Sequence, residues 1–400
     1  MQATLTTGVV PGEHGIVANG WYDRLTKKVS FWDQPEGLVQ APRIWEALKH
    51  QQPRAKTAVL FFQQTMYTEA DVVLSPAPIH LDTGMVQWVY SRPPGCYESL
   101  SKKVGPFNLM HYWGPMASLK SSEWIIRAAS HVLEAEAPVM TWMYLPHLDY
   151  NSQRFGPGSA QALADVKQVD GLVGELTEGV AKLPWGRDVT WVVVSEYALQ
   201  PVSGTVMINK ILREQGFLSV REIEGKEYLD FEFSKAFAVV DHQVAHVYIQ
   251  KGYVEAVRQL LLNVDGVEKV WNREEQKRYG IGHDRSGELV VVSRRDRWFA
   301  YYWWVDDSKA PPFAGTVDIH RKPGYDPVEL FFDPATKSIP LRPELVKGSH
   351  GVLVGDPKLD HTAFIVSGPH CPKDLPSSLD ATAVAGVVAS LAGMSWPPKL

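Results

Sequence analysis

Apolar runs and amphipathic segments alternate along the first half of the chain. Short continuous apolar runs are typical of buried strands, and apolar residues spaced about 3.6 positions apart are typical of helices packed on a core. We expect strands within 57–63, 138–145 and 187–197, and helices over 42–51, 121–135 and 159–183. This order predicts an α/β fold with a mostly parallel central sheet and helices on both of its faces.

The pattern becomes richer in strands after residue 214. We expect a strand over 237–249, a helix over 252–264 and a hairpin over 287–304. These elements predict an inserted α+β subdomain at 215–310, so that 1–214 and 311–400 form the two parts of the core. The Ala- and Gly-rich segment 381–396 predicts a C-terminal helix capped by Ser377 or Ser378.

Polar side chains follow two of the predicted core strands. His147, Asp149 and Gln153 come after the strand within 138–145, and Glu196 and Tyr197 end the strand within 187–197. In open α/β sheets, ligands bind beyond the carboxyl ends of the strands. We therefore expect these two polar segments to border the functional site.

Composition and charge narrow the class of partner. The chain has 400 residues, of which 45% are hydrophobic and 21% charged, as is ordinary for a soluble globular protein. Its formal net charge is −5, and no cluster of Lys and Arg stands out. This balance argues against a nucleic-acid partner and against an anionic membrane.

The cysteine content and the two ends of the chain indicate the cellular compartment of the protein. Cys96 and Cys371 lie far apart and offer neither zinc-finger spacing nor a disulfide framework, which favours a reducing compartment. No basic region followed by an apolar run is visible at the N-terminus, and segment 381–396 is too short to span a bilayer. We expect a cytoplasmic protein with no membrane partner; the sequence does not give its oligomeric state.

Several common catalytic motifs are absent from the sequence. It contains no HExxH, GxxxxGK[ST] or GxSxG, and no GxGxxG after a strand. Instead, ligand-type side chains are dispersed over strand ends and loops: Asp149, Glu196, Asp318, His320, Asp326 and His350. Carboxylates with one or two imidazoles suit Zn²⁺ or Mn²⁺, and two such ions can clamp a phosphate or sulfate ester.

Four segments, in order, resemble one known family. They are LTTGVVPGEHGIVANGWYD (5–23), YLPHLDYNSQRFGPGS (144–159), VVVSEYALQPV (192–202) and KGSHGV (347–352). Together they resemble the type I phosphodiesterase/nucleotide pyrophosphatase proteins of the alkaline phosphatase superfamily. The resemblance extends over nearly the whole chain.

The resemblance implies metal-dependent hydrolysis of a phosphodiester, pyrophosphate or phosphomonoester bond in a small molecule. In this family a Thr or Ser hydroxyl attacks the phosphorus, and water then cleaves the covalent ester. Two divalent ions, Zn²⁺ or Mn²⁺, lower the pKa of the hydroxyl and cancel charge on the transferred group. The implied cofactor is therefore a pair of divalent metal ions.

The resemblance also implies the ligands of these ions. Asp149 and His350 match an aspartate and a late histidine of the family. Gln153 stands where the family has a histidine, and Glu196 and Tyr197 stand at the aspartate and histidine of an Asp-His-Gly-Met sequence. We predict Asp149, Gln153, Glu196 and His350 as metal ligands. Since glutamine is a weak donor and tyrosine a rare ligand, at least one metal position is altered.

The family's nucleophile would fall just before Met1, and Thr4, Thr6 and Thr7 lie after its position. Two hypotheses account for this. The natural protein carries an upstream strand, an Asp and a Thr or Ser, or the chain is a variant without the usual nucleophile. We favour the first, because a domain without its central strand should fold poorly.

Further residues are predicted to line the substrate cleft: His147, Arg154, Tyr197, Asp318, His320, Lys322 and Asp326. Lys322 or Arg154 could pair with a phosphate. His147, Asp318 and His320 could also compensate for the altered metal ligands. The alternative is that 317–334 is a plain Pro-Gly loop whose aspartates cap backbone amides.

Other histidines and polar residues are expected to be structural. We interpret His14 as a turn histidine that caps backbone groups, and Asn19 as a turn residue. His242 and His246 alternate on the predicted strand over 237–249 and would share a face as a hydrogen-bonded pair.

Three functions therefore stay open on the sequence. The leading prediction is a hydrolase of phosphodiester, pyrophosphate or phosphomonoester bonds. A sulfatase or phosphomutase on the same fold is the alternative among enzymes. The alternative that is not an enzyme is an inactive relative that binds a ligand. The substitutions at Gln153 and Tyr197 and the missing nucleophile favour it.

Overall fold

The computed structural model describes residues 1–81, 84–353, 355 and 360–398. A four-stranded sheet with the order β7-β4-β3-β8 forms the first core. β3 pairs in parallel with β4 and β8, and β7 is antiparallel to β4. The strands are β3 (Thr57–Leu60), β4 (Val72–Pro76), β7 (Val89–Arg92) and β8 (Met140–Met143).

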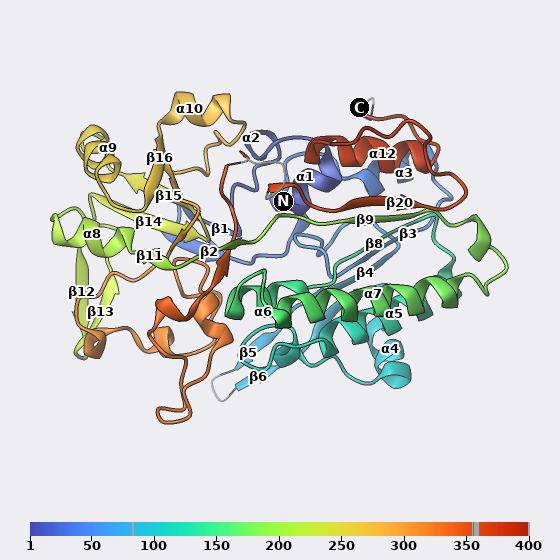
Figure 1. Cartoon of the computed structure of the whole chain (residues 1–400), viewed down its shortest axis with the longest axis horizontal. Coiled ribbons are helices and arrows are strands. Elements are labelled where there is room, and N and C mark those ends of the chain that lie inside the picture. The colour runs from blue at the N-terminus through green and yellow to red at the C-terminus, as the bar shows by residue number, and fades with distance from the viewer. Residues whose placement is uncertain (82–83, 354, 356–359, 399–400) are drawn as a thin grey trace.

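Helices cover both faces of this sheet, as Figure 1 shows. One face carries α4 (Cys96–Val104), α5 (Lys120–Glu136) and α7 (Ala160–Val180). The other face carries α1 (Gln2–Thr7), α3 (Ile44–Gln51) and α12 (Val384–Leu391). Alternate residues of each strand point to opposite faces, so Leu60 and Leu74 pack under the first group and Val59 and Val73 under the second. The predicted α/β fold with helices on both faces is confirmed.

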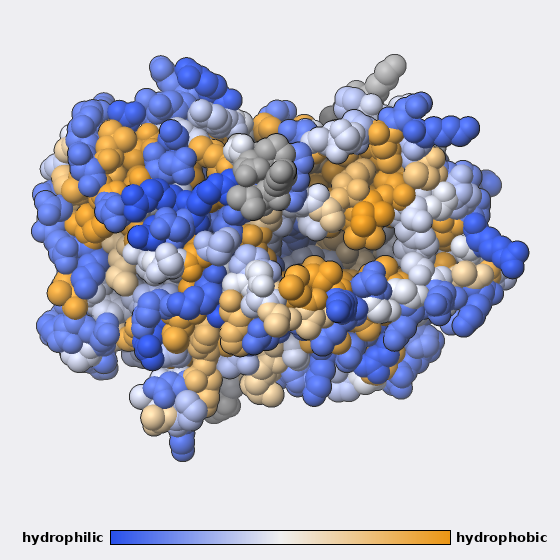
Figure 2. Space-filling view, viewed as in Figure 1, coloured by the Kyte–Doolittle hydropathy of each residue, from blue (hydrophilic) through white to orange (hydrophobic). Residues whose placement is uncertain are grey.

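The strand within 187–197 does not join this sheet. Among the described residues, β9 (Trp191–Val194) pairs only with β20 (Phe364–Ser367), and the two are antiparallel. Figure 2 shows apolar side chains at the surface over this pair, where Val193 and Ile365 are exposed. The expectation that β9 belongs to the parallel sheet is therefore wrong for the described residues.

The second core surrounds an antiparallel sheet with the order β14-β15-β17-β16. Its strands are β14 (Ala236–Asp241), β15 (Val244–Ile249), β16 (Val267–Trp271) and β17 (Leu289–Ser293). The accompanying helices are α8 (Ile208–Glu214), α9 (Val254–Leu262) and α10 (Arg273–Arg278). This sheet lies inside the predicted subdomain at 215–310, whose exact boundaries stay a prediction.

Short elements connect and flank the two cores. The hairpins are β1 (Gly20–Asp23) with β2 (Lys28–Phe31), β5 (Ile79–Leu81) with β6 (Gly84–Val86), and β12 (Val220–Ile223) with β13 (Lys226–Leu229). The other pairs are β10 (Gln200–Pro201) with β19 (Gly348–Ser349), and β11 (Gly204–Val206) with β18 (Arg297–Phe299). The short helices are α2 (Pro11–His14) and α6 (Leu148–Phe155).

Three local predictions are wrong. The predicted strand over 237–249 is a hairpin, because the chain turns at His242 in the left-handed region with a φ of 58°. The predicted hairpin over 287–304 does not form, since β18 pairs in parallel with β11. The C-terminal helix is not capped by Ser377 or Ser378; the Asp380 side chain caps the 3₁₀ turn that leads into it. None of the helices in the described ranges combines the length and apolar character needed to cross a membrane.

Candidate functional site

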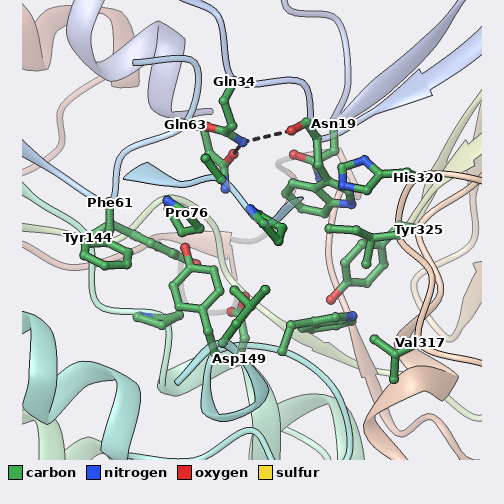
Figure 3. Close-up of a pocket in the computed structure, with 18 of the residues that line it drawn as sticks. Asn19, Gln34, Phe61, Gln63, Pro76, Tyr144, Asp149, Val317, His320 and Tyr325 are labelled. Carbon is green, nitrogen blue, oxygen red and sulfur yellow. Dashed lines mark hydrogen bonds between the residues drawn. The ribbon is translucent and has the colours of Figure 1, made fainter. Parts of the chain in front are cut away.

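Residues of both cores line a cavity of about 660 Å³. Figure 3 shows Phe61, Tyr144 and Asp149 of the first core facing His320 and Tyr325 across it. The apolar residues of the wall include Phe61, Met66, Met110, Trp113, Met116 and Ile319. Its polar residues include Gln2, Asn19, Gln63, Asp149, Glu196 and His350. The two polar segments predicted to border a site thus meet in one cavity.

Two half-buried carboxylates are among these polar residues. Asp149 is in the first turn of α6, so the segment after β8 forms a helix and not a loop. Burial raises the pKa of Asp149 to about 7, opposed by the Tyr197 hydroxyl, which donates to Oδ2 at 2.8 Å. Burial also raises the pKa of Glu196, whose Oε1 accepts from the Gln2 amide at 2.7 Å. A carboxyl group with a pKa near neutrality, such as that of Asp149, is suited to proton transfer.

Four rings stack into a continuous wall beside these carboxylates. The ring of Tyr197 lies 3.6 Å from that of His350, His350 lies 3.7 Å from His242, and His242 lies 3.9 Å from Tyr325. Burial lowers the pKa of His350 to about 3, so its imidazole is neutral near pH 7. The ends of the stack are fixed, because Tyr197 donates to Asp149 and Tyr325 donates to Gln153 Oε1 at 3.0 Å.

Asn19 lies in the cavity wall and is held by the half-buried Asp241. Its backbone N–H donates to Asp241 Oδ2 at 2.8 Å, and its side-chain amide donates to Oδ1 at 3.2 Å. Burial raises the pKa of Asp241 to about 6, and the two hydrogen bonds from Asn19 lower it. Asp241 therefore orients an amide at the edge of the cavity.

Sequence reasoning missed His242 and Asn19 as cavity residues. His242 was expected to pair with His246 on one strand face, but it lies in the turn, with its Nδ1 3.3 Å from Ser349 Oγ. Asn19 was interpreted as a plain turn residue. For Asn19, its position inside the HGI-x₂-N segment could have indicated a place near the site. For His242, the sequence offered no such indication.

Three predicted residues of the segment after β8 lie outside the cavity wall. His147 is buried, with its Nε2 2.9 Å from Gln168 Oε1 and 3.2 Å from Asp165 Oδ1. Arg154 donates to backbone carbonyls, including that of Leu330 at 3.1 Å. Gln153 is fully buried and bonded to Tyr325. Helix α6 turns these three side chains away from the cavity. Their positions therefore do not agree with the predictions that Gln153 is a metal ligand and that His147 and Arg154 line the cleft.

The loop at 317–334 is divided between the cavity and a buried ion cluster. Asp318 and His320 line the cavity. Lys322 lies behind it, with its Nζ 2.8 Å from Asp326 and 2.6 Å from Glu329, and each of the three side chains is about 1–2% exposed. The prediction that Lys322 and Asp326 line the cleft is therefore wrong, since their charges neutralise one another inside the protein.

The threonines near the N-terminus do not form a nucleophile–base pair. Thr4 Oγ1 lies 2.9 Å from His14 Nε2, and both side chains are buried. The Ile16 N–H donates to His14 Nδ1 at 3.1 Å, so Nε2 carries the proton and donates to Thr4. His14 is thus a structural turn histidine, as expected. Among the described residues that line the cavity, none is Ser, Thr or Cys, and none is Lys or Arg.

The described residues do not fit the two-ion centre that the sequence resemblance implies. Within the described ranges, no three or more His, Cys, Asp or Glu side chains are placed to hold a metal ion. Two residues at the implied ligand positions are engaged in other contacts: the Tyr197 hydroxyl donates a hydrogen bond to Asp149, and Gln153 accepts one from Tyr325. Asp149, Glu196 and His350 share the cavity without forming a ligand set.

Comparisons with known proteins agree with the resemblance. The sequence profile of the family described as type I phosphodiesterase / nucleotide pyrophosphatase matches residues 1–326. Human ectonucleotide pyrophosphatase/phosphodiesterase family member 1 is 24% identical over 218 residues, which is 52% of this chain and 20% of the human protein. An uncharacterized pyrophosphatase/phosphodiesterase of Schizosaccharomyces pombe is 22% identical over 205 residues, 51% of this chain and 36% of the yeast protein. The chain thus matches well under half the length of either relative.

Solved structures share the fold. Murine ectonucleotide pyrophosphatase/phosphodiesterase 5 superposes with a TM-score of 0.60 at 16% identity, covering 100% of this chain and 84% of that one. Phosphonoacetate hydrolase from Sinorhizobium meliloti, in complex with phosphonoacetate, superposes with a TM-score of 0.58 at 16% identity, covering 98% and 83%. The predicted alkaline phosphatase-like fold is confirmed. Since the profile match extends over most of the sequence, the chain belongs to the type I phosphodiesterase/nucleotide pyrophosphatase family.

Proposed function

We propose that this chain hydrolyses a phosphodiester or pyrophosphate bond of a small molecule in the 660 Å³ cavity. The observation that carries the proposal is the convergence of Asp149, Glu196 and His350, three residues singled out by the family resemblance, in one cavity. A murine relative of the same fold was solved in complex with AMP. Together these favour a small phosphate ester as the ligand.

The chain's own residues suggest how such an ester would be held. The Asn19 amide, oriented by Asp241, would donate a hydrogen bond to a phosphoryl oxygen. Asp149 or Glu196 would exchange a proton with the attacking or leaving oxygen. The apolar wall would bind the organic part of the ester and exclude water.

Divalent ions would need ligands beyond the side chains that converge here, because Gln153 and Tyr197 are engaged in other hydrogen bonds. For this reason the second candidate is a family member that binds a phosphate ester without cleaving it. The contacts of Gln153 and Tyr197 are the observations that favour it.

One experiment separates the two functions. Release of 4-nitrophenol from bis(4-nitrophenyl) phosphate and from 4-nitrophenyl phosphate would be followed with this chain and with a longer chain that includes the preceding in-frame sequence. Metal content would be read by elemental analysis. Diester turnover that is lost in Glu196→Gln but kept in Asp170→Asn, an exposed acid on α7, supports the hydrolase. Binding of AMP with no turnover in either chain supports the binding protein.

A further inference from the structure

A second pocket of about 390 Å³ adjoins the cavity. His320 lines both of them, so the two spaces meet at this side chain. The pocket is formed by β2, β13 and the loops around 312 and 320. None of the polar residues singled out in the sequence lies in it except His320.

The two spaces carry opposite charge. Four acids line the cavity, Asp33, Asp149, Glu196 and Asp318, and no lysine or arginine among the described residues does. The second pocket has Lys28 and Arg321 in its wall and no described acid. The second pocket therefore attracts anions more strongly than the first space does.

The rest of the second pocket is apolar and largely aromatic. Tyr228 and Phe313 lie edge to face, with ring centroids 6.4 Å apart, and Phe231 and Pro312 complete the wall. Flat rings stack well on such surfaces. A ligand that satisfies both features is aromatic and negatively charged.

The two cations are presented differently. Arg321 pairs with Asp318, and its guanidinium carbon lies 5.9 Å from the centroid of the Phe313 ring. Lys28 is exposed on β2 and has no ion-pair partner among the described residues. The opposite residue on β1, Asp23, forms no ion pair with Lys28 among the described residues; its Oδ1 accepts from the N–H groups of Leu25 and Thr26. Lys28 thus supplies the charge that is available to a ligand.

The geometry points to a binding site for a flat aromatic anion in this second pocket, with Lys28 contacting the anionic group and Tyr228 and Phe313 contacting the ring. Occupation of this site requires no hydrolysis. It therefore stands whether or not the chain is a catalyst.

The test uses two isosteric probes that contain no ester bond. Naphthalene-1-sulfonate carries the charge, and naphthalene-1-sulfonamide is its neutral twin. Affinities would be measured by calorimetry at low and high salt for the full chain, Lys28→Gln, Tyr228→Leu and the control Lys27→Gln. Lys27 is the neighbouring turn residue and does not line the pocket. Thermal unfolding would verify that each variant is folded.

We expect the sulfonate to bind more tightly than the sulfonamide, and salt to weaken only the sulfonate. A unit charge about 4 Å from an anion in water contributes about fivefold to the affinity for that anion. We therefore expect Lys28→Gln to weaken sulfonate binding by about fivefold. Lys27→Gln should change it little, and Tyr228→Leu should weaken both probes. Equal effects of the two lysine substitutions, or binding unchanged by both Lys28→Gln and Tyr228→Leu, would overturn the proposal.

Discussion

At the scale of single residues, the carboxylate of Asp241 fixes the position of Asn19. It accepts two hydrogen bonds from that residue and is the last residue of β14, next to the turn at His242. In Asp241→Asn one acceptor becomes an amide donor that faces another donor. We expect a loss of about 1–3 kcal/mol in the free energy of unfolding, measured with urea, and weaker AMP binding. Asp170→Asn on the exposed face of α7 is the control, and equal losses in both variants would contradict the assignment.

Tyr197 is the residue that separates the potential metal ligands. Its hydroxyl bonds to Asp149 and its ring stacks on His350. An imidazole at this position would place a third ligand-type side chain beside those two. We expect Tyr197→His to bind Zn²⁺ more tightly than the unaltered chain, by at least tenfold in competition with a chromogenic chelator. Tyr279→His, on the surface after α10, should not; if it gained the same affinity, the binding would lie elsewhere.

At the scale of elements, the buried ion cluster holds the loop that carries His320 and Tyr325 to the cavity. Lys322 pairs with Asp326 and Glu329, and the latter also accepts from the Trp113 indole N–H and the Asp318 backbone N–H. Lys322→Met would leave two buried carboxylates without a counter-charge. We expect a loss of about 3–5 kcal/mol in the free energy of unfolding.

Two further variants test this interpretation of the loop. Lys322→Met/Asp326→Asn/Glu329→Gln removes all three charges and should recover part of the lost stability. Lys309→Met removes an exposed pair with Glu222 and should have little effect. Chemical denaturation would measure all three variants. A single Lys322→Met variant as stable as the parent would show that the cluster does not hold the loop.

At the scale of the whole molecule, a neutral buried histidine joins the N-terminal region to the antiparallel sheet. The Gly287 N–H donates to His246 Nδ1 at 3.2 Å, so Nε2 carries the proton and donates to Val17 O at 3.3 Å. Burial lowers the pKa of His246 to about 4. In the unfolded chain its pKa is about 6.5, so between these values the unfolded state binds the additional proton.

Acid should therefore destabilise the molecule through this residue. Relative to His246→Gln, the parent chain should lose up to about 3 kcal/mol as the pH falls from 6.5 to 4, and the difference should be constant above pH 7. Urea unfolding of both proteins at pH 7.5, 6, 5 and 4.5 measures this. Parallel pH profiles would contradict the assigned protonation state.

The elements of the first core follow from local sequence. Apolar periodicity correctly predicts helices α5 and α7 and strands β3 and β8. Each of these elements is a short segment whose apolar residues pack against the same core, on one face or on both, and the spacing of those residues is visible in the sequence. Glu196, two residues after β9, and Asp149, after β8, also line the cavity that was expected to lie near these strand ends. Side-chain period and strand ends are properties of consecutive residues, so the sequence determines them.

Only the tertiary structure decided which of these side chains face the cavity and which are buried elsewhere. The chain reverses at His242, and this reversal stacks its ring between Tyr325 and His350. Lys322 is drawn into a buried pair and Gln153 is turned towards Tyr325, although both resembled site residues in the sequence. By itself the sequence determined the fold class, the family and the two segments that meet at the cavity. Which side chains face that cavity depends on contacts between distant segments, whose energies no local pattern records.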